Sequence, residues 1–172
     1  MPKLAIALEP ILDGTGSNNT PAGYEVVVSS GSQTSGTPKL TYDRYVFGQS
    51  ADTFVVGHFR VPDDYASGGV IGFEVGSDVT SGNFRMIAGV EPFDVSSTDT
   101  DAAVYNAADA SSATSVPGTA GQVKNLEITL TMTGVAAGEV VSVFLGRDPD
   151  HADDTAAGDV WVLCDSIYFE YA

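Results

Sequence analysis

The sequence predicts an all-β protein: a single-domain antiparallel β-sandwich of the jelly-roll type, with about eight strands. Apolar and polar residues alternate along several segments, most clearly from Leu126 to Thr133. This period of two gives a strand one buried face and one wet face. Turn-forming residues separate these segments at frequent intervals. No helical pattern alternates with the strands, as a βαβ architecture would require.

Residues 1–23 are expected to form an N-terminal arm, or an edge strand followed by a loop. The segment is apolar at first and becomes rich in turn-forming residues between Asp13 and Pro21. The jelly-roll domain is therefore expected to span residues 24–172.

Three strands are expected in the first part of that domain. They cover residues 24–28, 40–47 and 53–61. The third alternates clearly, with Val55 and Phe59 on one face and Phe54 and His58 on the other. Pro62 ends it, because proline fixes φ and has no N–H to continue a ladder.

The middle of the domain combines a predicted hairpin with a segment of unusual composition. Residues 70–75 and 83–90 are expected to pair antiparallel across residues 76–82. Residues 94–121 are rich in Ala, Ser, Thr and Asp and contain no Lys or Arg. Within them, residues 101–108 are expected to form a short strand flanked by loops.

The last three strands are expected at residues 123–133, 139–146 and 159–171. Five apolar side chains of the final strand share one face: Trp161, Leu163, Ile167, Phe169 and Tyr171. Such a row is more typical of a core than of a platform for stacking sugars, so Trp161 is expected to be buried there. Asp165 interrupts the row and needs a polar partner if it is buried.

The net charge restricts the class of partner. The chain carries a formal charge of −16, with only seven Lys and Arg against 23 Asp and Glu. Nucleic-acid binding needs clustered basic side chains, and an anionic membrane surface would repel this chain. We therefore expect neither partner, and attribute the charge to solubility and mutual repulsion between copies. The alternatives are an outward face on a crowded assembly and adaptation to high salt.

The chain has one cysteine, Cys164, so no intramolecular disulfide and no cysteine-based metal site can form. The N-terminal apolar stretch is too short for a signal peptide, and no stretch approaches the ~20 apolar residues that cross a bilayer. Synthesis and folding in a host cytoplasm are therefore expected.

The densest polar cluster is the loop at residues 147–155. Four carboxylates in it are weak candidate ligands for Ca²⁺: Asp148, Asp150, Asp153 and Asp154. The spacing of an EF-hand is absent. The alternative is a solvated turn in which Arg147 pairs with an aspartate and Asp153 or Asp154 caps backbone amides. No other cofactor is expected.

Neither histidine lies in a catalytic motif. A Ser-His-Asp triad needs a histidine beside an exposed serine, and the G-x-S-x-G elbow is absent. His58 is expected to be an interior or interface residue and His151 a surface residue. The paired carboxylates of a glycosidase leave no spacing signature, and nothing in the sequence points to them. We therefore predict no catalytic residues and no enzymatic activity.

A series of turn motifs extends over residues 53–171. In order they are Arg60–Gly69, Pro117–Gly121, Val135–Glu139 and Gly146–Asp159, followed by a closing aromatic strand. This pattern resembles a recurring module in virion proteins of tailed bacteriophages. The resemblance implies a β-sandwich or jelly roll that decorates heads or forms parts of tails and fibres, without shared catalytic residues.

The resemblance implies a viral structural protein on the capsid surface, namely a head decoration or cement protein. Its expected partner is the major capsid protein. It is also expected to self-associate, most simply as a homotrimer. The assembly candidates are Leu4, Ile6 and Leu8 as anchors of the arm, and Arg60 and Arg147 as scarce cations. Removal of residues 1–12 is then expected to leave a folded module. The alternative hypothesis is a receptor- or glycan-binding module of a tail fibre or spike.

Overall fold

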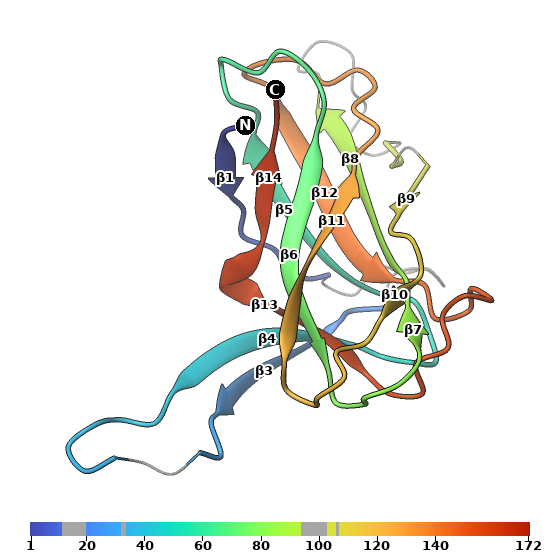
Figure 1. Ribbon diagram of the computed structural model, residues 1–172. Coiled ribbons are helices and arrows are strands. Elements are labelled where there is room, and N and C mark those ends of the chain that lie inside the picture. Colours follow the sequence, from blue (N-terminus) through green and yellow to red (C-terminus); the bar gives the residue numbers. More distant parts are fainter. Residues whose placement is uncertain (12–19, 32–33, 94–102, 106) are drawn as a thin grey trace.

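The computed structural model describes residues 1–11, 20–31, 34–93, 103–105 and 107–172, and they form two antiparallel sheets packed face to face (Figure 1). The seven-stranded sheet has the order β1 (Lys3–Ala5), β14 (Tyr168–Glu170), β6 (Val70–Ser77), β13 (Val160–Leu163), β4 (Thr41–Phe47) and β3 (Gly23–Val28), and β11 (Val123–Thr129) also pairs with β6. The all-β antiparallel sandwich expected from the sequence is therefore confirmed.

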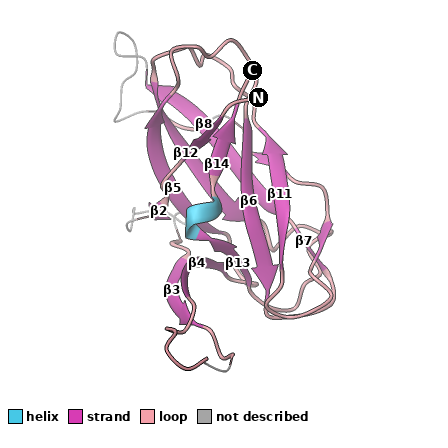
Figure 2. Cartoon of the chain, turned by 60° about the vertical axis from the view of Figure 1, so that its left-hand side comes forward, coloured by secondary structure: helices cyan, strands magenta, loops and turns pink. Residues whose placement is uncertain are grey.

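The second sheet has five strands, in the order β2 (Glu9–Pro10), β5 (Thr53–Arg60), β12 (Val140–Arg147), β8 (Met86–Phe93) and β9 (Asp109–Ala110). A small ribbon pairs β7 (Asn83–Phe84) with β10 (Thr114–Ser115). Figure 2 shows the two layers with one short 3-10 helix, η1 (Cys164–Ser166), beside them. No helix in the described ranges is long and apolar enough to span a bilayer.

The core lies between the sheets and is built from alternate residues of each strand. On β5, Val55 is fully buried whereas His58 is exposed. In and after β11, Ile128 and Leu130 are buried whereas Thr129 and Thr131 are exposed. The period-two alternation in the sequence thus identified the inner face of these strands correctly.

The predicted hairpin of residues 70–75 with 83–90 is wrong. In the structure β6 pairs with β11, β13 and β14, whereas β8 pairs with β12 and β9 in the other sheet. The chain therefore crosses from one layer to the other between them. Two adjacent strand patterns separated by a turn-rich loop fit a hairpin and a sandwich crossover equally well.

The last predicted strand is interrupted by a turn, so the apolar row of its first half lies on the opposite side of the sheet from the row of its second half. Val160 and Val162 belong to the core, so Trp161 and Leu163 project from the outer side of the seven-stranded sheet. The 3-10 turn η1 then shifts the phase, and Ile167, Phe169 and Tyr171 point into the core. Trp161 is 1% exposed as expected, although it does not belong to the core row.

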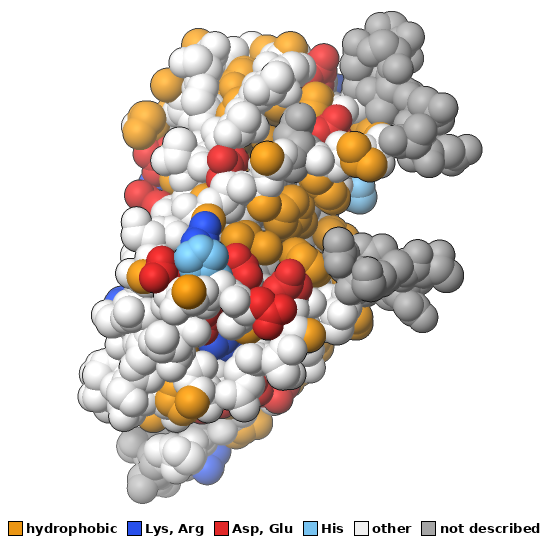
Figure 3. Space-filling view, turned by 90° about the vertical axis from the view of Figure 1, so that its right-hand side faces the viewer, with side chains coloured by type: hydrophobic (Ala, Val, Ile, Leu, Met, Phe, Trp, Pro, Cys, Tyr) orange, Lys and Arg blue, Asp and Glu red, His pale blue; other side chains and the backbone are white. Residues whose placement is uncertain are grey.

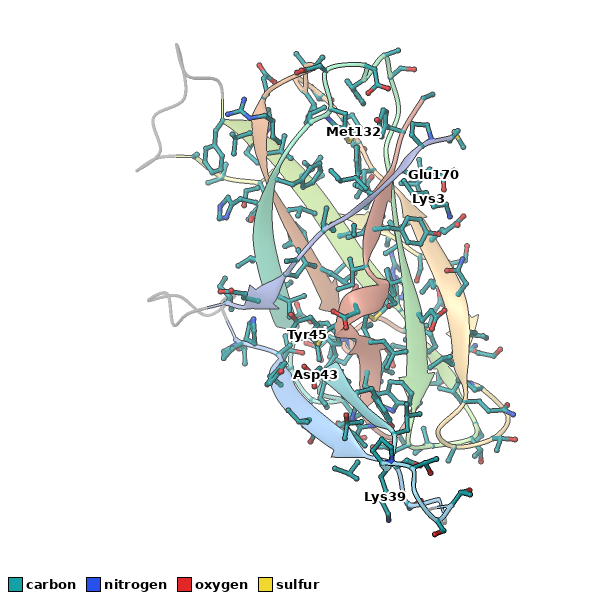
Figure 4. The ribbon with its side chains drawn as sticks, turned by 90° about the vertical axis from the view of Figure 1, so that its left-hand side faces the viewer. Lys3, Lys39, Asp43, Tyr45, Met132 and Glu170 are labelled. Carbon is teal, nitrogen blue, oxygen red and sulfur yellow. The ribbon has the colours of Figure 1, made fainter. Side chains whose placement is uncertain are left out.

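The N-terminal residues are an integral part of the sandwich. β1 pairs with β14 of the seven-stranded sheet and β2 pairs with β5 of the other, so the segment bridges both layers. Lys3 forms an ion pair with Glu170 (3.1 Å), the two side chains lying together in Figure 4. Ile6 and Leu8 are buried in the core of the same chain, and Leu4 is half-buried against it. These three residues therefore anchor their own domain.

The short strand expected at residues 101–108 falls partly outside the described residues. Residues 103–105 and 107–108 are described and are not in a strand; β9 begins at Asp109. Residues 103–105 lie against the outer face of the five-stranded sheet, where they contribute to the site described next.

Candidate functional site: an aromatic groove on the five-stranded sheet

The outer face of the five-stranded sheet carries a band of apolar and aromatic side chains. β12 lies between β5 and β8, and Phe144 stands opposite Val56 on one side and Gly89 on the other. Paired residues project from the same face. Because Val141, Val143 and Leu145 fill the core, the alternate residues face outward. The outward residues are Phe54, Val56, His58 and Arg60 on β5; Val140, Ser142, Phe144 and Gly146 on β12; and Ile87, Gly89, Glu91 and Phe93 on β8.

Two glycines leave room for aromatic rings to pack flat against this face. A Cβ at Gly89 would lie 2.5 Å from the ring of Phe144, and one at Gly146 would lie 2.5 Å from the ring of Phe54. No side chain larger than hydrogen fits beneath these rings without moving them. The two rings meet edge to face, with centroids 5.8 Å apart. They form the floor of the site.

This floor belongs to a groove on the outer face of the sheet. The central part of the groove has a volume of about 490 Å³ and is bordered by Ile11, Phe54, Phe144 and residues 103–105, which separate it from the smallest of the neighbouring depressions. Further depressions of about 510 Å³ and about 190 Å³ adjoin it and share lining residues with it. Figure 3 views this side of the molecule, where apolar side chains gather in a hollow.

Tyr105 forms one wall of the groove. Its ring lies edge-on to Phe144, with centroids 4.8 Å apart, and its hydroxyl is hydrogen-bonded to Ser142. Burial raises the pKa of Tyr105 above its usual value. The side chain is still 37% exposed, and the neighbouring Val104 is 77% exposed. The wall therefore presents apolar surface to the groove.

Polar side chains border the apolar floor. Glu9 and His58 line one end, and Glu91 and Ser142 line the other. The His58 ring is stacked on Phe93, with centroids 5.7 Å apart and planes 29° apart. His58 is exposed on this groove, so its predicted interior position is wrong. An apolar floor with polar borders suits an elongated ligand that has apolar faces and hydroxylated edges.

The acidic loop after β12 is organised around a buried arginine. Arg147 is 0% exposed; its Nε donates to Asp154 Oδ2 (2.9 Å) and its Nη2 donates to Asp154 Oδ1 (2.8 Å). The guanidinium also donates to the carbonyls of Ala156 (3.0 Å) and Gly158 (2.8 Å). Asp154 in turn accepts from the backbone N–H of Arg85 (3.0 Å). The predicted pairing of Arg147 with an aspartate, and the capping by Asp154, are confirmed.

The four carboxylates proposed as Ca²⁺ ligands do not form a metal cluster. Asp154 is engaged by Arg147, and Asp153 lies 3.6 Å from the His151 ring. Asp148 is 4.0 Å from Arg85 Nε. Within the described residues, no three His, Cys, Asp or Glu side chains converge as they would on a metal ion. Asp52 is nearby, and burial together with Asp148 and Asp150 raises its pKa.

The two arginines proposed for assembly occupy different environments. Arg147 is fully buried, so it is not available to a partner surface. Arg60 is exposed on the outer face of β5, and its guanidinium donates to the Gly138 carbonyl. Its position places it at the edge of the groove face, beside the row that contains His58.

The sequence analysis missed the groove, although one signal was present. Residues 140–145 are apolar at nearly every position, so both faces of that strand carry apolar side chains. Such a strand in a two-layer sandwich must expose one apolar face or cover it with something else. The apolar row that contains Trp161 gave no indication of Phe54, Phe93 and Phe144, which lie on the opposite sheet.

The fold is similar to that of solved carbohydrate-binding modules. A CBM28 module, described as specific for non-crystalline cellulose, matches with 10% identity over 96% of this chain and 89% of its own, at a TM-score of 0.50. An arabinose-bound GH51 α-L-arabinofuranosidase matches with 14% identity over 95% of this chain but 23% of its own, at a TM-score of 0.53. A family 11 module from Clostridium thermocellum in complex with a β-1,3-1,4-mixed-linked tetrasaccharide matches with 14% identity over 98% of both chains, at a TM-score of 0.43.

The two matches with TM-scores of 0.50 and 0.53 confirm the jelly-roll β-sandwich. No protein-family model and no curated protein sequence matches the chain. The comparisons support the jelly-roll part of the phage resemblance and give no support to a virion protein. The turn motifs behind that resemblance are structural, and loops of this kind recur wherever a sandwich needs short connections.

Proposed function

We propose that this chain is a non-catalytic carbohydrate-binding module whose groove on the five-stranded sheet holds a stretch of a neutral polysaccharide. The observation that carries the proposal is the hollow bordered by half-buried Phe54 and 37% exposed Tyr105, both of which contact the largely buried ring of Phe144 (8% exposed). The fold shared with the CBM28 module supports the same class. This proposal takes the glycan-binding alternative of the sequence analysis, without its tail-fibre location.

The surface of the groove matches the surface of a sugar chain. A pyranose ring has two apolar C–H faces and a rim of hydroxyl groups, so it stacks on aromatic rings and hydrogen-bonds at its edges. Here Phe54 and Tyr105 offer ring surface, and Glu9, His58 and Glu91 border it, whereas Ser142 is buried and hydrogen-bonded to Tyr105. The adjoining depressions extend the groove along the sheet, which favours a chain over a single sugar.

The charge of the molecule favours a neutral glycan. At −16, the protein repels uronate-rich or sulfated polysaccharides. Two glutamates on the borders of the groove add to this effect. Neutral β-glucans, xylans, galactans and arabinans remain as the class to test.

Affinity measurements on a panel of these neutral polysaccharides test the proposal. We expect one or more to bind, and Phe54→Ala and Tyr105→Ala each to weaken binding roughly tenfold, because each removes a stacking surface worth ~1 kcal/mol or more. Tyr24→Ala is the matched control, since Tyr24 is a 52% exposed aromatic on β3 of the other sheet. The absence of binding to the whole panel would contradict the proposal, and so would an equal loss in the control.

A further inference from the structure

Strand β3 is an open edge with an exposed apolar face. It is the last strand of the seven-stranded sheet, and β4 is its only strand partner among the described residues. Three alternate residues are largely exposed: Tyr24 (52%), Val26 (62%) and Val28 (55%). Large apolar side chains in such a row on a free edge usually mark a contact surface.

These residues are exposed because the hairpin extends beyond the body of the sandwich. Tyr24 stands opposite Tyr45, a core residue, so its row belongs to the inner side of the sheet. The β3–β4 hairpin projects away from the second layer (Figure 1), with Lys39 near its far end in Figure 4. The second sheet does not extend over this hairpin, so it does not cover the inner face of β3.

The free backbone groups of β3 lie on the same three residues. Ser29 N–H donates to the Leu40 carbonyl (2.8 Å), which makes Ser29 and Leu40 a hydrogen-bonded pair. In an antiparallel ladder such pairs alternate, so residues 25 and 27 also bond toward β4. The N–H and C=O groups of Tyr24, Val26 and Val28 therefore point away from β4, toward the open edge.

Strand β3 itself carries little charge, and the charge nearest its exposed row is Asp43 of β4, which lies opposite Val26 and accepts from the Tyr24 hydroxyl (2.8 Å). The only charged residue of β3 is Glu25, and its carboxylate pairs with Arg44 of the same chain (2.9 Å). Edge strands are usually guarded by lysine, proline or a bulge, and β3 has none of these. An incoming strand would meet backbone donors, backbone acceptors and apolar side chains.

We propose that β3 pairs with β3 of a second copy of this chain, antiparallel about a two-fold axis at Val26, so that the two seven-stranded sheets become continuous. In this register Val26 meets its own counterpart, and Tyr24 meets Val28 of the second copy. All the free backbone groups of the three residues are then satisfied. Glu25 falls opposite Val27 and not opposite a second glutamate, so the strand is complementary to itself.

The total charge opposes this association and makes it depend on the salt concentration. Two copies at −16 each repel one another, and added salt screens that repulsion. The dimer is therefore expected to become stronger as ionic strength rises. An isologous contact of this kind closes at two copies.

Sedimentation velocity of the full chain tests the proposal, over roughly tens to hundreds of micromolar protein and at low and high salt. We expect a monomer–dimer equilibrium that shifts at least threefold toward dimer at high salt. Val26→Lys brings two positive charges together at the axis and should abolish the dimer. Leu40→Lys makes the same charge change at a 70% exposed site off the β3 edge and should leave dimerisation intact.

Circular dichroism of both variants establishes that they are folded, since both positions are exposed. A wild-type chain that stays monomeric at high salt would overturn the proposal. So would a trimer, or a V26K variant that dimerises as strongly as L40K. The groove lies on the other sheet, so V26K should bind a short oligosaccharide, which occupies one site, as the wild type does.

Discussion

Arg147 is the residue on which the order of the acidic loop depends. Its guanidinium is fully buried and holds Asp154 through two parallel hydrogen bonds, while two further loop carbonyls accept from it. Asp154, itself 2% exposed, then caps the backbone at Arg85. The spacing in the sequence suggested the pair, but burial could not be read from it, because a loop rich in Asp is ordinarily solvated.

Arg147→Ala is expected to lower the free energy of unfolding by ~3–5 kcal/mol, because it leaves the buried Asp154 carboxylate without its counter-charge. Urea unfolding measures this loss. Adding Asp154→Asn to Arg147→Ala should cost much less than the sum of the two single losses. Additive losses, or a loss below ~1 kcal/mol for the single variant, would show that the pair does not organise the loop.

Because of Cys164 and Tyr45, the folded state is expected to lose stability at alkaline pH. Burial raises the pKa of Cys164 from 9.0 to about 11, and burial likewise raises the pKa of Tyr45 above 10.0. Both groups are neutral in the folded state. The contribution of Cys164 is complete below pH 9.0 and is lost as pH rises through about 11, and the contribution of Tyr45 begins to be lost only above pH 10.0. Stability measured by urea unfolding should therefore decline across this window.

Cys164→Ser is the matched variant for this titration, because serine does not ionise in the window. It should decline less steeply than the wild type between pH 9.0 and about 11. An unchanged stability of the wild type through that range would contradict the assignment. An equal decline in both proteins would attribute the effect to Tyr45 alone.

At the scale of elements, the N-terminal segment is a structural part of both sheets. β1 extends the seven-stranded sheet, β2 extends the other, and Leu8 between them is 2% exposed. The Leu8 carbonyl also accepts a hydrogen bond from the Tyr45 hydroxyl. The expectation that residues 1–12 can be removed from a folded module therefore conflicts with the packing.

Leu8→Ala is expected to lower the free energy of unfolding by ~2–5 kcal/mol, since it creates a cavity between the layers. Leu40→Ala removes the same atoms from a side chain that is 70% exposed, and should change stability by less than ~0.5 kcal/mol. Thermal or urea unfolding of the two variants measures these changes. If neither variant changes the free energy of unfolding appreciably, the N-terminal segment is not part of the folded core.

At the scale of the whole molecule, the sequence predicted the class of fold and the inner faces of its clearest strands. It did so because burial on one face imposes a period of two, as Val55 and Ile128 illustrate. It could not predict which layer a strand joins, so β6 and β8 were paired wrongly. It also could not predict the phase shift at η1, which depends on one three-residue turn.

The candidate site was harder to predict than the fold because it is a property of three strands together. Phe54, Gly89 and Phe144 are distant in sequence, and only their register brings ring and glycine into contact. The glycine and the ring that packs on it come from different strands, so the sequence of either strand alone does not indicate the contact. Residues 103–105, which form the wall, lie in a segment for which the sequence predicted a short strand flanked by loops.

NMR titration of the full chain with a soluble neutral oligosaccharide tests our proposal that a polysaccharide binds on the outer face of the five-stranded sheet. We predict that the largest shifts fall on Phe54, Tyr105 and Phe144 and on the backbone of β5 and β12. Shifts confined to the β3–β4 hairpin or to the outer face of the seven-stranded sheet would contradict the account.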